Sequence, residues 1–600
     1  MVSPFGAELL GALKRRHPAA TITHVEHVPA RHARYSEWPG WVEPRLQQLL
    51  IDEGFASPYL HQAQCAEHAW RGDDVVVATG TSSGKSLGYQ LPVLTTLAQD
   101  PTACAVYLTP TKALGSDQLQ ATLRMVQAAG LEGIHPAPYD GDTPAESRAG
   151  IREHTRYVFT NPDMLHASVL GSHARWARVL RHLKYVVVDE CHTYRGVFGA
   201  NVALVLRRLL RIAAAYGASP TVIYASATAA DPAGQARRLS GREAVAVTDD
   251  AAPAGERTIV LWEPGFIEGA EGEGGAPVRY PATTEAASVS AELLLQGART
   301  LTFVRSRRAA ETVAMRTQEH LSAAGRADVA ERVAPYRAGY LAEDRRELER
   351  RLDSGELLGV ASTNALELGI DVGGLDAVVM AGFPGTVASF RQQAGRAGRR
   401  GQSSVAVLVA RDEPMDTYLV HHPDALLGTP VENSVFDPTN PFILRGHVYC
   451  AAVERPLSEA DVEAFGARDV VDDLTAAGLL RRRPAGWFAV PQLDGEVTPE
   501  SAHASVSLRG GVGEQVMIVD VTDGRLLGTV DAARAMSQVH DGAVYIHQGE
   551  YFVVQTLDLD DYVALVAPER PDYSTQARST TDITILGKPH ELVNPSPGLW

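Results

Sequence analysis

The chain has 600 residues, more than one hydrophobic core can organise, so we expect several domains. Its hydrophobic content of 45% and charged content of 21% exclude a disordered or fibrous chain. The formal net charge of -17 excludes nucleic-acid binding through bulk positive charge, although a local basic groove remains compatible with it.

The four cysteines, Cys65, Cys104, Cys191 and Cys450, are widely spaced and form no C-x-x-C pair. This spacing predicts single buried thiols in a reducing compartment, with neither a disulfide framework nor a zinc site. The N-terminus has no basic stretch followed by an apolar core, and no apolar run approaches the roughly 20 residues that span a bilayer. We therefore expect a cytoplasmic protein without a membrane segment.

Residues 1–45 are expected to form an N-terminal extension, and residues 46–250 a first α/β domain. In this domain, short β-branched or aromatic runs alternate with helical stretches, which predicts a parallel sheet with crossover helices. Each run ends at a polar motif, and ligands of open α/β sheets bind at these carboxyl ends of the strands. The expected strands are 75–78, 105–108, 157–160, 185–188 and 222–225.

A stretch rich in Gly, Ala, Glu and Pro predicts a linker at 251–284, and the alternation resumes in a second α/β domain at 285–432. After Pro441, two helices over 458–478 and a hairpin over 479–490 predict a winged-helix module at 433–500. Residues 501–600 are expected to form a small β-rich domain, with a hairpin turn at Gln548-Gly549-Glu550. The expected strands of the second domain are 301–304, 358–361 and 377–380.

The segment 79–86 follows an expected strand and precedes an expected helix, as a phosphate-binding loop does. Its glycines would let backbone N–H groups converge on phosphate oxygens, Lys85 would bridge the β- and γ-phosphates of ATP, and the Ser86 hydroxyl would ligate Mg²⁺. The strict loop template has Gly where Thr79 stands, so for this loop alone a Gly/Ser-rich turn stays an alternative. The candidate nucleotide-binding residues are Thr79, Gly80, Thr81, Ser82, Ser83, Gly84, Lys85 and Ser86.

Two further segments strengthen the prediction of an ATP site. Asp189 and Glu190 end an apolar strand, where the first would hold Mg²⁺ and the second would orient the attacking water. Far along the chain, Gln392 precedes Arg396 and Arg399 in a glycine-containing segment, which is typical of arginines that reach a γ-phosphate from a second domain. An ATP site divided between two domains can open and close with each cycle, which predicts a nucleic-acid motor.

The sequence Asp189-Glu190-Cys191-His192 resembles the four-residue box of superfamily 2 helicases, and Ser226-Ala227-Thr228 resembles their coupling motif. The resemblance implies two tandem RecA-like domains, in which His192, Ser226 and Thr228 relay the state of the γ-phosphate. It also implies an adenine contact by Gln62 and roles for Arg396 and Arg399 as arginine fingers in the motif that Gln392 begins. Gly369 and Asp371 resemble motif V, whose acid approaches the ribose.

Short polar pairs that follow strands in both domains suit phosphate contacts without sequence information. Each pair alone is more often a helix cap or a turn, but together and in this order they resemble the strand-binding motifs of helicases. On the expected wing, an arginine run (481–483) and Trp487 suggest contact with a phosphate and a base, while a solvated arginine cluster fits equally well. The candidate nucleic-acid-binding residues are Pro110, Thr111, Lys112, Thr160, Asn161, Pro162, Arg305, Ser306, Ser362 and Thr363.

Nearly the whole chain resembles the MrfA-type DNA helicase family, through segments 30–37, 78–87, 139–143, 440–444 and 539–545. The resemblance implies an ATP-dependent helicase that translocates 3′ to 5′ on single-stranded DNA in DNA repair. Its expected partners are single-stranded DNA and tailed duplex DNA, with a repair nuclease as a further candidate, and we expect a monomer. An RNA helicase and a non-catalytic nucleic-acid-binding scaffold remain the alternatives.

The cysteines depart from this family in one respect. Its members carry a four-cysteine zinc cluster near the C-terminus, and the printed sequence has no such cluster. Either the chain stops before that cluster or this member lacks it. The expected cofactors are therefore ATP and Mg²⁺, and zinc is not carried over.

Overall fold

The computed structural model describes residues 5–17, 21–272, 275–367, 374–398, 401–491, 498–509 and 515–578, together with Thr580, Asp582 and Thr584. The chain divides into two compact units. The first comprises residues 1–338 and 342–512, and the second comprises residues 339–341 and 513–600. Among the described residues, the helices are all too short or too polar to cross a bilayer.

The first domain of the larger unit is built on a seven-stranded sheet in which all paired strands are parallel. Its strands are β2 (Val75–Ala78), β3 (Cys104–Leu108), β4 (Pro136–Pro138), β5 (Tyr157–Thr160), β6 (Leu183–Val188), β7 (Thr221–Ser226) and β8 (Val245–Val247). The order β4-β5-β3-β6-β7-β2-β8 places the five expected strands at the centre. The two edge strands have three residues each, too few for a recognisable alternation in the sequence.

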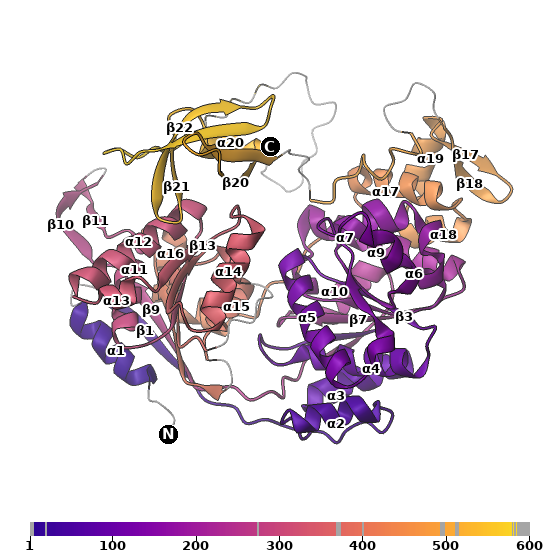
Figure 1. Cartoon of the computed structure of the whole chain (residues 1–600), viewed down its shortest axis with the longest axis horizontal. Helices are drawn as coiled ribbons and strands as arrows, with labels where there is room; N and C mark the ends of the chain where they lie inside the picture. The colour runs from indigo at the N-terminus through magenta and orange to yellow at the C-terminus, as the bar shows by residue number, and fades with distance from the viewer. Residues whose placement is uncertain are drawn as a thin grey trace, which may run out of the picture. The chain divides into compact units, whose positions relative to one another are not determined.

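Alternate side chains of these strands face two separate cores. Val75 and Val77 pack with α3 (Leu60–Arg71) and α4 (Lys85–Gln99), whereas Val76 packs with α9 (Gly196–Ala215). Helices therefore cover both faces of the sheet, as in other parallel sheets (Figure 1). The remaining helices of this domain are α2 (Pro44–Asp52), α5 (Lys112–Ala128), α6 (Ser147–His154), α7 (Pro162–Met164), α8 (Ala177–Arg181) and α10 (Pro232–Ser240).

The second domain has another seven-stranded sheet, with the order β1-β9-β16-β15-β12-β14-β13. Its strands are β1 (Thr21–Val28), β9 (Arg257–Glu263), β12 (Thr300–Phe303), β13 (Val333–Tyr336), β14 (Gly359–Ser362), β15 (Ala377–Ala381) and β16 (Ser404–Val409). Only the β1–β9 pair is antiparallel within this described sheet. The helices are α1 (Phe5–Arg16), α11 (Ala282–Leu295), α12 (Arg307–Ala323), α13 (Ala327–Ala330), α14 (Ala342–Asp353), α15 (Val387–Ala394) and α16 (Pro414–His421).

Two segments differ from the sequence prediction. The expected N-terminal extension (1–45) contributes β1 to the second sheet, and the expected linker (251–284) contributes β9. Strand β9 pairs with β1 on one side and β16 on the other, and nearly all its side chains are buried. The expected linker also holds the small β10 (Phe266–Glu271) and β11 (Pro277–Arg279) pair. These pairings join distant parts of the chain, and local sequence patterns do not reveal them.

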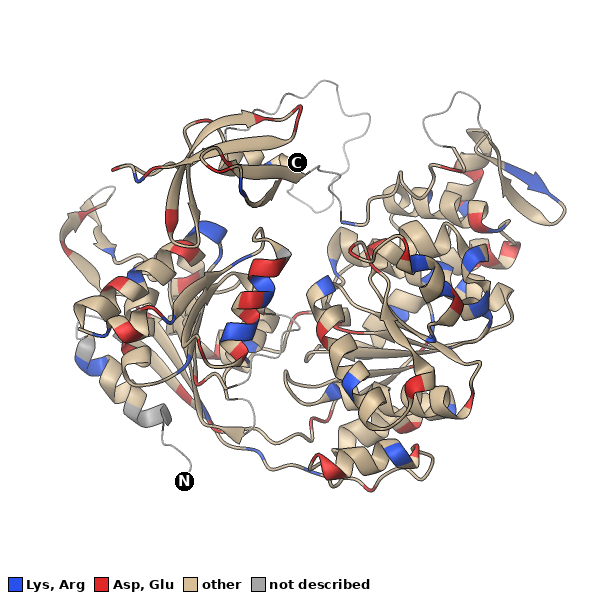
Figure 2. Cartoon of the chain, in the orientation of Figure 1, with Lys and Arg blue, Asp and Glu red and all other residues tan. Residues whose placement is uncertain are grey.

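The winged-helix module has the two helices and the hairpin that the sequence predicts. It comprises α17 (Pro441–Glu454), α18 (Glu459–Phe465), α19 (Arg468–Ala476), β17 (Leu480–Arg483) and β18 (Gly486–Ala489). Figure 2 shows the basic run on β17, whose three arginines are exposed. The suggestion that Trp487 stacks on a base is wrong, because this side chain is 2% exposed in the core of the module. Its ring instead packs beneath the guanidinium groups of Arg468 and Arg482.

The smaller unit is β-rich, as expected. Its five-stranded sheet has the order β20-β19-β23-β22-β21. Gln548 and Gly549 form the predicted hairpin turn, both with positive φ angles, of 50° and 86°. The elements are β19 (Gln515–Asp520), β20 (Leu526–Asp531), α20 (Ala532–Gln538), β21 (Val544–His547), β22 (Glu550–Asp558) and β23 (Val563–Pro568).

Candidate nucleotide and nucleic-acid site

The phosphate-loop candidate lies between the carboxyl end of β2 and the start of α4, where the sequence places it. The Lys85 ammonium donates to the carbonyl oxygens of Gly80, at 2.8 Å, and Thr79, at 3.3 Å. The Thr79 hydroxyl, standing where the strict template has Gly, hydrogen bonds to that of Ser83 at 2.6 Å. Burial lowers the pKa of Lys85, while the nearby Glu190 and Asp189 carboxylates oppose that shift. The loop is therefore closed around its own lysine.

Helix α3 braces this loop through two neighbouring side chains. The Gln62 amide donates to the Gly84 carbonyl at 2.8 Å and accepts from the Tyr59 N–H at 2.8 Å. A Cβ atom on Gly84 would lie 2.6 Å from that amide, and the φ of Gly84 is +73°, so only glycine fits there. With both ends of its amide engaged, Gln62 positions the loop, and its contact with adenine stays a prediction.

His61 is a contact that the sequence prediction missed. This buried imidazole accepts at Nδ1 from the Ala251 N–H (3.2 Å), so the proton is assigned to Nε2, which donates to the Ser83 carbonyl (3.0 Å). Burial lowers the pKa of His61 and favours this neutral form. His61 thus ties the phosphate loop to the segment that leads into the second domain. The motif Tyr59-Leu60-His61-Gln62 was the available signal, although it pointed to Gln62 alone.

The two acidic candidates lie at the carboxyl end of β6. Asp189 is 7% exposed, and its carboxylate accepts hydrogen bonds from the hydroxyls of Tyr107 and Tyr89 and from the Glu190 N–H. Burial and the adjacent Glu190 raise the pKa of Asp189 above its ordinary value. Glu190 has a φ of +48°, an uncommon conformation for a residue with a side chain and one that concentrates at functional sites. No sequence motif predicted that two tyrosines would hold Asp189.

His192 joins three of the predicted motifs. Its Nδ1 lies 3.3 Å from a Glu190 carboxylate oxygen and accepts from the Ala227 N–H at 3.2 Å. Its Nε2 lies 2.5 Å from the side-chain amide of Gln392 in the second domain. Burial and the nearby Lys85 lower the pKa of His192 to about 3, so the ring is neutral. Of its two predicted coupling partners, Ser226 is fully buried at the end of β7 and Thr228 is exposed.

The second domain approaches the loop through the segment after α15. A Cβ atom on Gly395 would lie 2.1 Å from the Thr81 hydroxyl, so this contact between the domains requires a glycine. Arg396 is 4% exposed and donates to the backbone carbonyl of Glu367. Burial lowers the pKa of Arg396, and the charge of Glu190 opposes the shift. The predicted site residues Arg399, Gly369 and Asp371 lie outside the described residues.

A pocket opens beside the phosphate loop. It is lined by Thr81, Ser82 and Ser83 from the loop, by Gly395 and Gly398 from the second domain, and by Arg31, Asp250 and Arg257. The Asp250 carboxylate accepts from the Arg31 guanidinium (2.8 Å) and from the Gly80 N–H (3.1 Å). Arg31 and Arg257 therefore bring two cations to the rim of a loop suited to phosphate. Arg31 lies in segment 30–37 of the family resemblance and Arg257 in the expected linker, but neither was a candidate site residue.

Several of the strand-binding candidates cap helices. Thr111, Asn161 and Ser306 accept, through their side-chain oxygens, the backbone N–H of Leu114, Met164 and Ala309 respectively. The Thr160 hydroxyl donates to the Tyr139 carbonyl, and the Ser362 hydroxyl donates to the Thr363 carbonyl. Lys112 pairs with Asp142 at 2.6 Å, and Arg305 donates to the Phe383 carbonyl. Pro110 and Pro162 lie beside the capped helix starts, and phosphate contact by this whole set stays a prediction.

Comparison with known proteins decides the family. Three family descriptions match the chain: DEAD/DEAH box helicase at residues 59–235, helicase conserved C-terminal domain at 285–401, and the winged helix domain of ATP-dependent helicase HRQ1 at 436–511. The ATP-dependent helicase YprA of Bacillus subtilis is 38% identical over 585 residues, covering 96% of this chain and 75% of YprA. The chain belongs to the family of ATP-dependent helicases that includes YprA.

A second relative and a solved structure support this assignment to the family. The ATP-dependent helicase HRQ1 of Saccharomyces cerevisiae is 38% identical over 94% of the chain, which spans about half (52%) of HRQ1. The crystal structure of the DUF1998 helicase MrfA bound to DNA and AMPPNP matches with a TM-score of 0.88 and 37% identity. That match covers 96% of this chain and 79% of MrfA. The resemblance to MrfA-type helicases and the α/β fold class, with two RecA-like domains and a winged-helix module, are therefore confirmed.

Within the described residues, no cluster of three or more His, Cys, Asp or Glu side chains could hold a metal ion. All four cysteines fall in described segments, as buried and unpaired thiols. Ser86 in the first turn of α4 and Asp189 at the end of β6 offer a hydroxyl and a carboxylate, the oxygen ligands that Mg²⁺ prefers when a nucleotide carries it.

Proposed function

We propose that this ATP-dependent helicase hydrolyses ATP when it is bound to single-stranded DNA and moves along that strand 3′ to 5′. The observation that carries the proposal is the contact of His192 with both Glu190 and Gln392. Through it, the residue proposed to orient water in one domain communicates with the segment of the other domain that bears Arg396. A change at the γ-phosphate can thereby alter the contact between the two domains.

The proposed roles follow from the positions of the side chains. The N–H groups at the start of α4 and Lys85 bind the phosphates, and Glu190 orients the attacking water. Ser86 and Asp189 would hold Mg²⁺, which would neutralise charge on the phosphates. Arg396 stabilises the charge that develops in the transition state, for which its guanidinium must turn from the Glu367 carbonyl to the nucleotide. Arg399, Gly369 and Asp371 keep the roles that the family resemblance implies.

The substrates and partners are also proposals. MrfA has been crystallised with DNA, which supports single-stranded DNA and tailed duplex DNA as the polymers bound here. We further propose action in DNA repair, a monomeric state, a cytoplasmic location and a repair nuclease as a candidate partner. Because the chain spans only about half of HRQ1, activities of whole relatives are not carried over without test.

Polymer-dependent ATP hydrolysis tests the proposal. Hydrolysis is measured without polymer and with single-stranded DNA, duplex DNA or single-stranded RNA at one stated salt concentration, because binding to nucleic acid depends strongly on salt. We expect the strongest stimulation by single-stranded DNA. Equal or greater stimulation by RNA would make the protein an RNA helicase, and no hydrolysis under any condition would favour a non-catalytic scaffold.

A further inference from the structure

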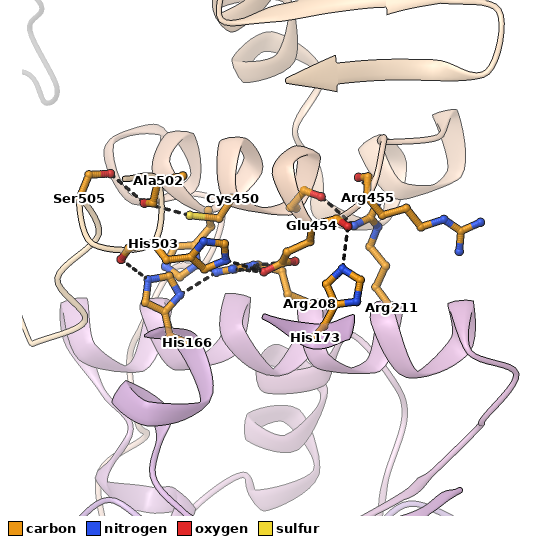
Figure 3. Close-up of polar contacts among 12 residues, drawn as sticks. His166, His173, Arg208, Arg211, Cys450, Glu454, Arg455, Ala502, His503 and Ser505 are labelled. Carbon is orange, nitrogen blue, oxygen red and sulfur yellow. Dashed lines mark hydrogen bonds and ion pairs between the residues drawn. The ribbon is translucent and has the colours of Figure 1, made fainter. Parts of the chain in front are cut away.

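A segment that follows the winged-helix hairpin lies across the first RecA-like domain. We call residues 498–509 the strap. Within it, the Ala502 carbonyl accepts from the Cys450 thiol of α17 at 3.3 Å. The His503 carbonyl accepts from Nε2 of His166 at 2.9 Å, and the Leu508 carbonyl accepts from the Asn201 amide of α9 at 3.0 Å. The strap is therefore fixed to both the winged-helix module and the first domain (Figure 3).

A buried ion pair anchors the strap. Arg208 on α9 and Glu454 on α17 have side chains with no exposed surface, and the guanidinium donates to the carboxylate through both Nε and Nη2. His503 of the strap donates from Nε2 to the same carboxylate at 3.0 Å (Figure 3). Burial alone would raise the pKa of Glu454, but Arg208 and His503 together lower it to about 2. The carboxylate is thus charged, and the strap supplies one of its hydrogen bonds.

Two histidines complete this buried cluster. Arg208 donates from Nη1 to Nδ1 of His166 and to Nδ1 of His447, both at 3.0 Å. Since both Nδ1 atoms accept, each ring proton is assigned to Nε2, which donates to the His503 carbonyl from His166 and to the Asn201 amide oxygen from His447. Burial and the charge of Arg208 lower the pKa of His166 to about 3. The cluster therefore holds a single hydrogen-bond pattern at neutral pH.

The end of the strap carries an arginine to the strand-binding candidates. Arg509 donates from Nε and Nη2 to the Asp163 carboxylate, at 3.0 and 2.9 Å, and from Nη2 to the Pro110 carbonyl at 2.8 Å. Its guanidinium carbon lies 4.5 Å from the centre of the Phe198 ring. Pro110 and Asp163 belong to the two polar segments that follow β3 and β5, so Arg509 lies between them.

This arginine has hydrogen-bonding capacity left over. A guanidinium has five N–H donors in a fixed planar arrangement, and the three bonds above use Nε and Nη2. Nη1 has no partner among the residues that the structure describes, and the side chain is 50% exposed. The ring of Phe198, the Asp163 carboxylate and the Pro110 carbonyl hold the group in place, so binding a further anion would cost little conformational entropy.

We propose that Arg509 is an additional nucleic-acid-binding residue, whose Nη1 contacts a backbone phosphate of the single strand between the two polar segments of the first domain. The buried cluster around Arg208 and Glu454 positions it by fixing the strap. This inference rests on the proposed function, because it needs a strand that passes over these segments. The alternative is that Arg509 only fastens the end of the strap through Asp163.

The salt dependence of single-stranded DNA binding separates these two roles. Arg509→Gln in the full chain removes one cation, so the slope of log K against log salt should fall by about 0.7, the value for one phosphate contact on a single strand. The matched control is Arg326→Gln, an exposed arginine that is also paired with a carboxylate, here Asp328 at 2.8 Å, and it should leave the slope unchanged. Binding is measured by fluorescence anisotropy between about 50 and 200 mM salt.

Asp163→Asn is the second variant. If Arg509 contacts phosphate, removal of the competing carboxylate should keep or raise DNA affinity, and it should keep the wild-type salt slope. If Arg509 only fastens the strap, Asp163→Asn should weaken binding as much as Arg509→Gln does. That result, or an unchanged slope in Arg509→Gln, overturns the inference while the proposed function stands. Failure of the wild-type protein to bind any single strand would contradict both.

Discussion

His192 and Gln392 lie 2.5 Å apart, although they belong to different RecA-like domains and are separated by 200 residues. The imidazole also contacts Glu190, so one neutral ring joins the proposed water-orienting carboxylate to the segment that carries Arg396. The contact gives hydrolysis a route to the arrangement of the two domains.

Replacement of Gln392 by Ala should weaken this communication. A lost hydrogen bond between neutral groups is worth about 1 kcal/mol, so we expect stimulation of ATP hydrolysis by single-stranded DNA to fall about fivefold. Hydrolysis without DNA should change less, because no bond within the first domain is lost. Gln393→Ala is the neighbouring control, since Gln393 instead donates to Glu367. Equal stimulation in wild-type protein and Gln392→Ala would refute the proposed coupling.

Arg396→Ala should reduce turnover far more than affinity for ATP. A positively charged finger acts on charge that develops in the transition state, and its loss typically costs about 10³-fold or more in kcat. Steady-state kinetics with saturating DNA would give kcat and KM separately. Arg391→Ala, on the preceding helix α15 and bonded to the carbonyls of Leu427 and Thr429, should retain kcat. A rise in KM alone would show that Arg396 binds the ground state.

Glu454→Ala should destabilise the contact between the winged helix and the first domain. It leaves Arg208 buried without its carboxylate, which typically costs about 3–5 kcal/mol. The combined Arg208→Met and Glu454→Leu variant removes both charges and should recover much of that loss. Urea unfolding of each protein measures the difference. Additive losses in the double variant would mean that the two side chains do not form the pair described here.

Lowering the pH should destabilise the same contact between the winged helix and the first domain. The pKa of His166 is about 3 in the folded chain against an ordinary value of 6.5. Between these pH values the unfolded state therefore binds a proton that the folded state does not bind. Stability from this group is complete above pH 6.5 and falls as the pH drops towards 3. Glu454, with a pKa of about 2, adds a further loss below its ordinary value of 4.5. The free energy of unfolding, measured from pH 7 to 4, should decline less in His166→Gln than in the wild-type protein.

Local sequence patterns predicted the central strands of both sheets because they are short, β-branched and bounded by polar motifs. They could not predict the pairing of β1 with β9, since neither strand has its partner nearby in the chain. Contacts between distant residues also limited what could be predicted of the candidate site. Lys85, Asp189 and Glu190 stand in recognisable motifs, whereas Asp250 and Tyr107 reach the site through tertiary contacts alone.

The arginines and aromatic residues show a second limit. Trp487 looked available to a base because it follows a basic run, but the wing turns its ring into the module core. Arg509 follows no motif, and its place beside Pro110 and Asp163 depends on how the strap is anchored. Whether a polar or aromatic side chain faces solvent is decided by packing, which sequence spacing does not contain.

Unwinding of tailed duplexes directly tests the proposal that the protein uses ATP to move 3′ to 5′ along single-stranded DNA. Strand separation is followed on matched duplexes with a 3′ single-stranded DNA tail, a 5′ tail or no tail, with ATP, in wild-type protein and in Glu190→Gln. We expect ATP-dependent unwinding of the 3′-tailed duplex alone, and none by Glu190→Gln, which should still bind DNA. Equal unwinding of the 5′-tailed duplex would contradict the proposed polarity, and full activity of Glu190→Gln would contradict the assigned ATP site.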